Sequence, residues 1–196
     1  MKHFIISLLA LVSVSAIAQE CSVDIARSAP DTRFVLNDEG SVKDQLTGLT
    51  WMRCRLGQTW NKVDKTCDGT PQTFYWQSAL TTIETINDPN GNHALHQFSG
   101  MKQWRLPNVK ELYSLTEVAC YGPAMNTKVF AETFKQEVAD PSAKLWSSTP
   151  ANNVFDLDDV AKGTDGKKIM TYYTMNGEVY PQLPGKYEFG ILLVAE

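Results

Sequence analysis

The sequence predicts an α+β fold, a single domain with two helices on a mostly antiparallel sheet and long loops between them. Two segments place apolar residues at helical spacing, and several short apolar segments are separated by polar turns that are typical of hairpins. The 196 residues suffice for one well-buried core, and they include no internal repeat or interdomain linker.

The first 18 residues have the composition of a secretory signal peptide. Lys2 precedes an apolar run over residues 4–14, and Ala16 and Ala18 are small residues placed for cleavage. The run is shorter than the roughly 20 residues of a membrane-spanning helix. We expect an exported protein that begins near Gln19 and lies in the periplasm, outside the cell or on the cell surface, with no membrane span.

The charge of the chain excludes some partners. Removal of the leader takes away Lys2 and no acidic residue, which changes the net charge from −4 to −5. No run of basic residues is present. We therefore expect neither nucleic acid nor an anionic membrane as a partner.

The first β-elements follow one another closely. Two apolar segments, 33–36 and 42–45, flank a polar turn that ends in Gly40, and this pattern predicts a hairpin. Residues 49–52 predict a buried strand that leads into Cys54.

Two helices are predicted next. The first has apolar residues at helical spacing, namely Tyr75, Ala79, Leu80, Ile83 and Ile86. Thr73 is its expected N-cap, and a polar turn over residues 87–92 ends it. The second follows Pro107, where Asn108 and Glu111 have the spacing of a capping box. We expect this helix to end at Cys120.

The last third begins with loops and ends in β-structure. Asn176 and Gly177 lie between segments 168–174 and 178–183, which is the strongest hairpin signal in the chain. Residues 190–194 form a final apolar strand, short enough to be central in a sheet.

All four cysteines, Cys21, Cys54, Cys67 and Cys120, follow the predicted leader. An even number in an exported chain indicates two disulfides, for which three pairings exist. Because Cys54 and Cys67 bracket a polar loop, we expect them to pair, which leaves Cys21 to tie the N-terminal arm to Cys120. The alternative is a zinc site, but the chain has no Cys-x-x-Cys motif and its histidines are badly spaced.

Three short motifs, at residues 47–51, 104–112 and 146–149, resemble the Lcl C-terminal domain family, which is named after a collagen-like bacterial adhesin. The resembling residues are Gly48, Leu49, Trp51, Cys54, Gly57, Trp60, Cys67, Trp76, Ala79, Trp104, Arg105, Leu106, Pro107, Lys110, Glu111, Leu112, Cys120, Trp146, Ser147 and Ser148. The resemblance implies one such domain over residues 33–196, after an arm of residues 19–32.

The resemblance also carries implications for fold and ligand. Arg-Leu-Pro before a glutamate-bearing helix is similar to formylglycine-generating and C-type-lectin-like folds, which implies a C-type-lectin-like single domain. Adhesin members of the family are associated with sulfated glycosaminoglycans, which call for basic surfaces. This chain is net negative and no collagen-like stalk precedes its domain, so neither that ligand nor a stalk-built trimer is carried over.

Aromatic residues are the candidate ligand contacts. Trp60, inside the loop between Cys54 and Cys67, and Tyr121 have polar neighbours and are the tentative sugar-stacking residues. For both residues the favoured interpretation is a lid packed on the core. The tryptophans beside apolar segments are expected in the core, namely Trp51, Trp104 and Trp146. Arg105 is expected to be buried and to pair with a protein carboxylate or backbone carbonyls.

We expect no cofactor, resident metal or catalytic group. The acidic segment from Asp156 to Asp159 and the turn from Asp88 to Asn92 have calcium-type ligands, but the expected structure in both is a solvated loop. His93 and His96 lack an evident third metal ligand. Ser147 and Ser148 lie in no nucleophile elbow.

The sequence therefore predicts an exported, non-enzymatic binding module, lectin-like or adhesin-like, that recognises a glycan, surface polymer or surface protein. One alternative is a structural or assembly subunit of a pilus or secretion apparatus, which an unpaired sheet edge would favour. The other is an enzyme of the formylglycine-generating type, which requires at least one free, exposed thiol.

Overall fold

The computed structural model describes residues 19–130, 140–151 and 167–196. In them it has two α-helices and four sheets, and every pair of neighbouring strands is antiparallel. The predicted α+β class is therefore confirmed. The predicted signal peptide lies outside the described residues.

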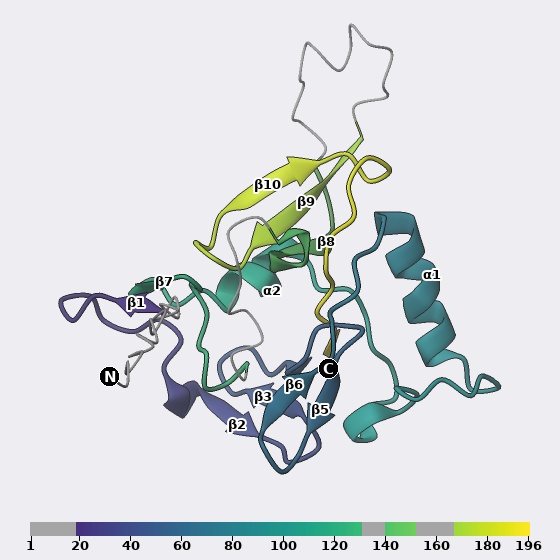
Figure 1. The fold of residues 1–196 in the computed structure, drawn as a ribbon, viewed down its shortest axis with the longest axis horizontal. Coiled ribbons are helices and arrows are strands. Elements are labelled where there is room, and N and C mark those ends of the chain that lie inside the picture. The colour runs from purple at the N-terminus through teal and green to yellow at the C-terminus, as the bar shows by residue number, and fades with distance from the viewer. Residues whose placement is uncertain (1–18, 131–139, 152–166) are drawn as a thin grey trace, which may run out of the picture.

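Two sheets form the body of the molecule (Figure 1). The four-stranded sheet has the order β11-β4-β3-β2, with β2 at Phe34–Leu36, β3 at Ser41–Asp44, β4 at Thr50–Met52 and β11 at Val194–Ala195. The three-stranded sheet has the order β10-β9-β8, with β8 at Lys144–Ala151, β9 at Lys168–Tyr173 and β10 at Val179–Gln182. Two small hairpin-like sheets pair β1 at Glu20–Cys21 with β7 at Cys120–Tyr121, and β5 at Thr59–Asn61 with β6 at Thr66–Asp68.

Both predicted hairpins are confirmed, and local turn chemistry explains them. Between β2 and β3, the N–H of Gly40 donates to the carbonyl of Asn37, and Gly40 has a φ of 94° that a residue with a side chain rarely adopts. Between β9 and β10, Gly177 has a φ of 77° and its N–H donates to the carbonyl of Tyr173.

The C-terminal segment 189–195 connects the two sheets (Figure 1). Gly190 exchanges backbone hydrogen bonds with β8, Ile191 and Leu193 accept from Leu56 and Met52, and Val194 pairs with Arg105 on the side opposite β4. All seven residues of the segment are buried. The prediction of a central final segment is confirmed, although the paired strand β11 is only two residues long.

Alternate residues of this segment belong to two different hydrophobic clusters. Leu192 and Val194 pack in one cluster with Trp51, Leu112, Leu115, Phe130, Leu145 and Tyr172. Phe189, Ile191, Leu193 and Ala195 pack in the other with Ala79, Ile83, Ile86, Trp104 and Trp146. Because successive side chains of an extended chain point to opposite faces, one strand can serve both cores.

Helix α1, Trp76–Asn87, lies against the second cluster through Ala79, Ile83 and Ile86. Its predicted cap is wrong: the N-cap residue is Tyr75, and the Thr73 hydroxyl donates to Glu188 instead. The N–H of Trp76 is bonded to the carbonyl of Pro184, so a distant loop satisfies the helix start.

Helix α2, Val109–Ser114, has the predicted capping box. The N–H of Glu111 donates to the Asn108 side chain at 2.9 Å, and the Glu111 carboxylate accepts from the Asn108 N–H at 2.7 Å. The predicted end at Cys120 is wrong. Thr116 forms a bridge with Met125, and the following residues turn back in β-type pairing, so the helix ends at Ser114, six residues earlier than expected.

Both predicted disulfides, Cys21–Cys120 and Cys54–Cys67, are present. Cys120 lies on β7 directly opposite Cys21 on β1, so this bridge joins two strands rather than the arm to a helix.

A buried ion pair fixes the first hairpin to the rest of the domain. The Arg33 guanidinium binds the Asp44 carboxylate with Nε at 2.7 Å from Oδ1, and its Nη1 donates to the carbonyl of Ser114. The Asp44 side chain is fully buried and also accepts from Thr47. Removal of one partner of a buried pair leaves the other charge uncompensated.

We expect Asp44→Asn to lower the free energy of unfolding by about 3–5 kcal/mol at neutral pH, measured by urea denaturation. Glu39→Gln is the matched control, because Glu39 forms an exposed ion pair with Lys62 whose loss costs about 0–1 kcal/mol. Equal effects of the two substitutions would contradict the structural role of the buried pair.

The pKa of Asp44 predicts how the stability difference between wild type and Asp44→Asn changes with pH. Burial alone would raise the pKa of Asp44, but hydrogen bonds from Arg33 and Thr47 hold the pKa below its ordinary value. A carboxyl with a lowered folded pKa stabilises the fold above its unfolded pKa of about 3.9, and the contribution is lost as pH falls through the folded pKa. The stability difference between wild type and Asp44→Asn should therefore shrink below about pH 4.

Candidate ligand-binding cavity

A cavity of about 440 Å³ opens beside the β5–β6 hairpin. Its walls come from three parts of the chain, the segment 52–60, the loop 93–98, and the turn before β3. The lining residues are Glu39, Gly40, Met52, Cys54, Arg55, Leu56, Gly57, Gln58, Thr59, Trp60, Lys62, Gln72, Thr82, His93, Ala94, Leu95 and Phe98. Apolar and polar side chains are both well represented, although most of the surface exposed to the cavity is apolar, as in typical small-molecule sites.

The disulfide Cys54–Cys67 closes one wall. The sequence suggested a polar loop between these cysteines, but the structure forms β5 and β6, with Trp60 opposite Cys67. The turn is held by the Asn61 side chain, which donates to Asp64 and Asp68 at 3.0 and 2.9 Å. The wall is therefore a small hairpin whose shape is set by a covalent bond and its own side chains.

Trp60 is held by protein contacts on several sides. The Arg53 guanidinium lies 4.1 Å from the centroid of its ring, and its indole N–H donates to the carbonyl of Asp38 at 2.8 Å. A Cβ on Gly40 would lie 2.4 Å from the ring, so the turn before β3 also contacts it closely. Trp60 thus lines the cavity as a fixed wall that links two hairpins.

The floor of the cavity contains a buried cation. Arg55 donates from Nη1 to the backbone and hydroxyl oxygens of Ser142, at 2.9 and 2.7 Å. Burial lowers the pKa of Arg55 to about 10, with Asp140 opposing the change, so the group stays charged at neutral pH. Arg55 anchors the floor to the start of β8.

Gln58 lines the cavity and carries a buried polar atom without a partner among the described residues. Its side-chain nitrogen lies 3.5 Å from the carbonyls of Cys67 and Gly69. Its side-chain oxygen is buried, and within the described part of the chain it accepts no hydrogen bond. A buried polar group in this state costs about 1–3 kcal/mol relative to a bonded one.

The opposite wall is an irregular loop over residues 93–98. The His93 ring accepts a hydrogen bond from the N–H of Leu95 at 3.1 Å, and Gln97 adopts a left-handed φ of 53°. The Phe98 ring packs against Trp104 at a centroid distance of 6.0 Å. The buried Trp104 thereby supports the wall from behind.

The two sugar-stacking candidates do not come together. Tyr121 lies on β7, is 57% exposed, and donates its hydroxyl to Glu20. It does not line the cavity that contains Trp60. Trp51, Trp104 and Trp146 are in the core as predicted, with 0–1% exposure.

Arg105 pairs with a protein carboxylate, as predicted. Its two Nη atoms donate to the two carboxylate oxygens of Glu111 at 2.8 and 2.9 Å. Burial alone would raise the pKa of Glu111, but this pair and the capping bond from Asn108 lower it. The predicted burial of Arg105 is wrong, because 39% of its side chain is exposed.

Of the metal and nucleophile candidates that the structure describes, His93 lines the cavity, whereas Asp88, Ser147 and Ser148 do not. Asp156–Asp159 lies outside the described residues. In the turn after α1, an Asp88 oxygen accepts from the N–H of Asn90. Among described residues no three acids, histidines or cysteines are grouped to hold a metal ion. The Ser147 hydroxyl donates to the carbonyl of Met170, and all four cysteines are in disulfides.

Sequence reasoning did not identify Gln58, Leu56 or the loop over residues 93–98 as parts of a binding cavity. The chain offers no local signal for them, since the cavity depends on contact between segments about 40 residues apart. The nearest usable clue is the pair of cysteines that flanks Gln58.

Gly40→Ala tests whether close packing of the turn holds Trp60 in place. We expect strain at positive φ to lower the free energy of unfolding by about 1–3 kcal/mol. The clash of the added Cβ with the Trp60 ring should lower it by roughly another 1–3 kcal/mol. The substitution should also speed amide exchange in β5 and β6. Gly48→Ala is the matched control, since Gly48 has a φ of 75° and nothing within 4 Å of an added Cβ. Equal effects in both variants would show that the packing is loose.

Within the described residues, no helix has the length and apolar composition to cross a membrane. No curated protein and no solved structure matches the chain, so the C-type-lectin-like similarity stays a prediction. A family model described as the Lcl C-terminal domain matches residues 40–189, which is about three quarters of the chain and includes every residue that lines the cavity except Glu39. The chain belongs to the Lcl C-terminal domain family.

Proposed function

We propose that this protein is an exported, surface-associated binding module and that its cavity takes an uncharged glycan or surface polymer. Family membership supports a surface-associated domain. The two disulfides suit an oxidising compartment outside the cytoplasm. The ligand contacts belong to the cavity rather than to Tyr121.

The observation that carries the proposal is the buried oxygen of Gln58 in a wall of the cavity. A folded protein rarely leaves such an acceptor without a donor. A ligand hydroxyl would supply that donor once the Gln58 amide turns toward the cavity, because the oxygen is closed to solvent in the present structure. The apolar lining from Met52, Leu56, Leu95 and Phe98 suits the apolar faces of a sugar ring.

The charges around the cavity favour an uncharged ligand. On the rim, Lys62 is paired with Glu39. The guanidinium of Arg53 lies over Trp60, and that of Arg55 donates to Ser142. Since the chain is net negative as well, a densely sulfated polymer would meet no array of available cations.

The proposal includes no catalytic step. A formylglycine-generating enzyme requires a free thiol, and each cysteine of this chain is in a disulfide. The Ser147 hydroxyl is donated to a backbone carbonyl inside the core. Binding on a rigid support is the activity that these contacts favour.

Gln58→Met separates binding from stability. The substitution keeps the length of the side chain and removes its buried oxygen, so the free energy of unfolding should stay equal or rise by up to about 1 kcal/mol. Affinity for the best ligand of an array of uncharged and sulfated glycans should fall about tenfold, measured by calorimetric titration.

Gln77→Met is the matched control, because Gln77 is exposed on α1 away from the cavity. It should leave both the affinity and the stability unchanged. Absence of saturable binding across the array would overturn the proposal. If wild type and Gln58→Met bound a glycan equally well, the binding site would have to lie away from Gln58.

A second candidate function is an assembly subunit, favoured by the edge of the four-stranded sheet. Among the described residues no strand pairs with the outer side of β2, where Val35 and Leu36 are each 50% exposed. Under this alternative Val35→Lys should abolish co-purification with a surface fibre while the fold survives. A wild-type protein that co-purifies with no fibre would exclude it.

A further inference from the structure

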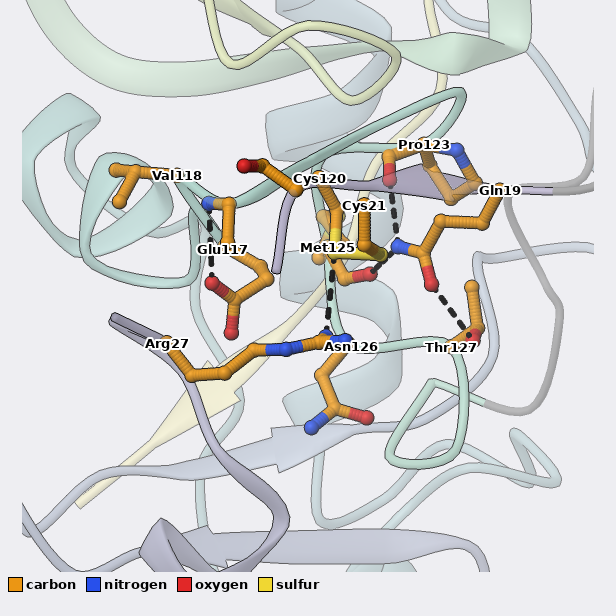
Figure 2. The surroundings of a disulfide bond; sticks show 12 residues. Gln19, Cys21, Arg27, Glu117, Val118, Cys120, Pro123, Met125, Asn126 and Thr127 are labelled. Atoms are coloured by element: carbon orange, nitrogen blue, oxygen red, sulfur yellow. Dashed lines mark hydrogen bonds between the residues drawn. A yellow bond between two sulfur atoms is a disulfide. The ribbon is translucent and has the colours of Figure 1, made fainter. Parts of the chain in front are cut away.

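The Cys21–Cys120 disulfide has one accessible end and one buried end beside a cation. Cys21 is exposed on β1, whereas Cys120 on β7 is 6% exposed. The guanidinium of Arg27 donates from Nη1 to the sulfur of Cys120 at 3.2 Å, and Figure 2 shows it reaching this sulfur from below the bridge. The two cysteines of the bridge therefore differ in exposure, and a cation contacts the sulfur of the buried one.

We propose that this disulfide is a site of thiol–disulfide exchange that takes an external dithiol as its reactant. The asymmetry of the bridge sets the direction of attack. An external thiolate attacks the sulfur of Cys21, the exposed residue of the pair, the S–S bond breaks, and the electron pair leaves on the sulfur of Cys120. The positive guanidinium of Arg27 stabilises that thiolate and makes it a better leaving group.

The second thiol of the reactant completes the exchange. It attacks the mixed disulfide on its own partner sulfur, and Cys21 leaves as a thiolate that takes a proton from water. The dithiol is oxidised to a disulfide, and two protein cysteines are reduced. The reaction needs no other oxidant or reductant.

Two acids lie near Arg27, and both are bonded to other groups. Asp31 accepts from Asn126 and Lys128 at 2.8 and 2.9 Å, and these bonds together with the charge of Arg27 lower its pKa. Glu117 is buried in the same corner, but its carboxylate accepts from the backbone N–H groups of Ser28, Ala29 and Ala119 at 3.1 to 3.2 Å. Hydrogen bonds from three amides spread and offset this negative charge. Arg27 is the group in direct contact with the leaving sulfur.

The fold tolerates opening of this bridge, because other bonds hold the arm on both sides of it. The Gln19 side chain donates to the carbonyls of Pro123 and Met125, both at 2.7 Å (Figure 2). Further along the arm, the Ser28 hydroxyl donates to the carbonyl of Thr116 at 2.7 Å. Reduction should therefore loosen residues 20–27 and leave both hydrophobic clusters intact.

The test follows the reduction of both disulfides in the native protein. Samples are treated with limiting dithiothreitol near neutral pH, alkylated at intervals and mapped by mass spectrometry. We expect Cys21–Cys120 to be reduced about tenfold faster than Cys54–Cys67, since Cys54 is buried and Cys67 is partly buried. Amide exchange should rise in residues 20–27 and in the paired strand β7, but not in the two hydrophobic clusters.

Substitutions at Arg27 isolate the charge. Arg27→Gln should slow reduction of Cys21–Cys120 about threefold, Arg27→Lys should retain most of the rate, and neither should alter Cys54–Cys67. Lys128→Gln is the matched control, because Lys128 lines the same surface pocket as Arg27 but its ammonium is bonded to Asp31.

Each contrary result overturns a stated part of the proposal. Faster reduction of Cys54–Cys67 in the wild type would remove the exchange site. An unchanged rate in Arg27→Gln, or an equal loss in Lys128→Gln, would remove the role of the guanidinium at the sulfur. These outcomes are independent of glycan binding, because the disulfide does not line the cavity.

Discussion

The fold depends on one buried strand-like segment, residues 189–195, that is shared by two hydrophobic cores. Its buried backbone needs hydrogen-bond partners on both sides, and they come from β8, β4, Leu56 in the lining of the cavity, and Arg105. Gly190 lets the segment lie close to Ser142, since an added Cβ would be 2.6 Å from the carbonyl oxygen of Ser142. Both sheets and both helices are positioned by this common element, so a disturbance here would reach all of them.

The same segment also positions the cavity. The N–H of Leu56 donates to the carbonyl of Ile191 at 3.1 Å, which attaches the floor to the shared strand. Arg55 attaches it to Ser142. The walls are secured separately, one by the disulfide and Trp60, the other by the packing of Phe98 on Trp104. A rigid floor with independently held walls is an arrangement in which wall residues can change without loss of the core.

Sequence reasoning succeeded where the deciding interactions are local. The capping box at Asn108, the hairpin turns at Gly40 and Gly177, and the alternation of the last segment all act over a few residues, so the chain carries their signal directly. It failed where a distant partner decided the outcome. Pro184 satisfies the start of α1, which frees Thr73 from the capping role. The cavity belongs to this second class, and the family resemblance, which included only Cys54, Gly57 and Trp60 of its lining, carried no information about the space between them.

The two disulfides have different physical tasks, although the sequence presents them as equivalent. Cys54–Cys67 spans 13 residues and shapes a hairpin that is itself a wall of the cavity. Cys21–Cys120 spans 99 residues, and such long-range closure restricts the unfolded chain more strongly. Yet the arm it joins is already bonded to Glu117, Thr116 and Met125 in the folded state. The long bridge therefore acts mainly on the unfolded chain, while the short one acts on the geometry of the binding wall. A cell could open the first without dismantling the site that the second maintains.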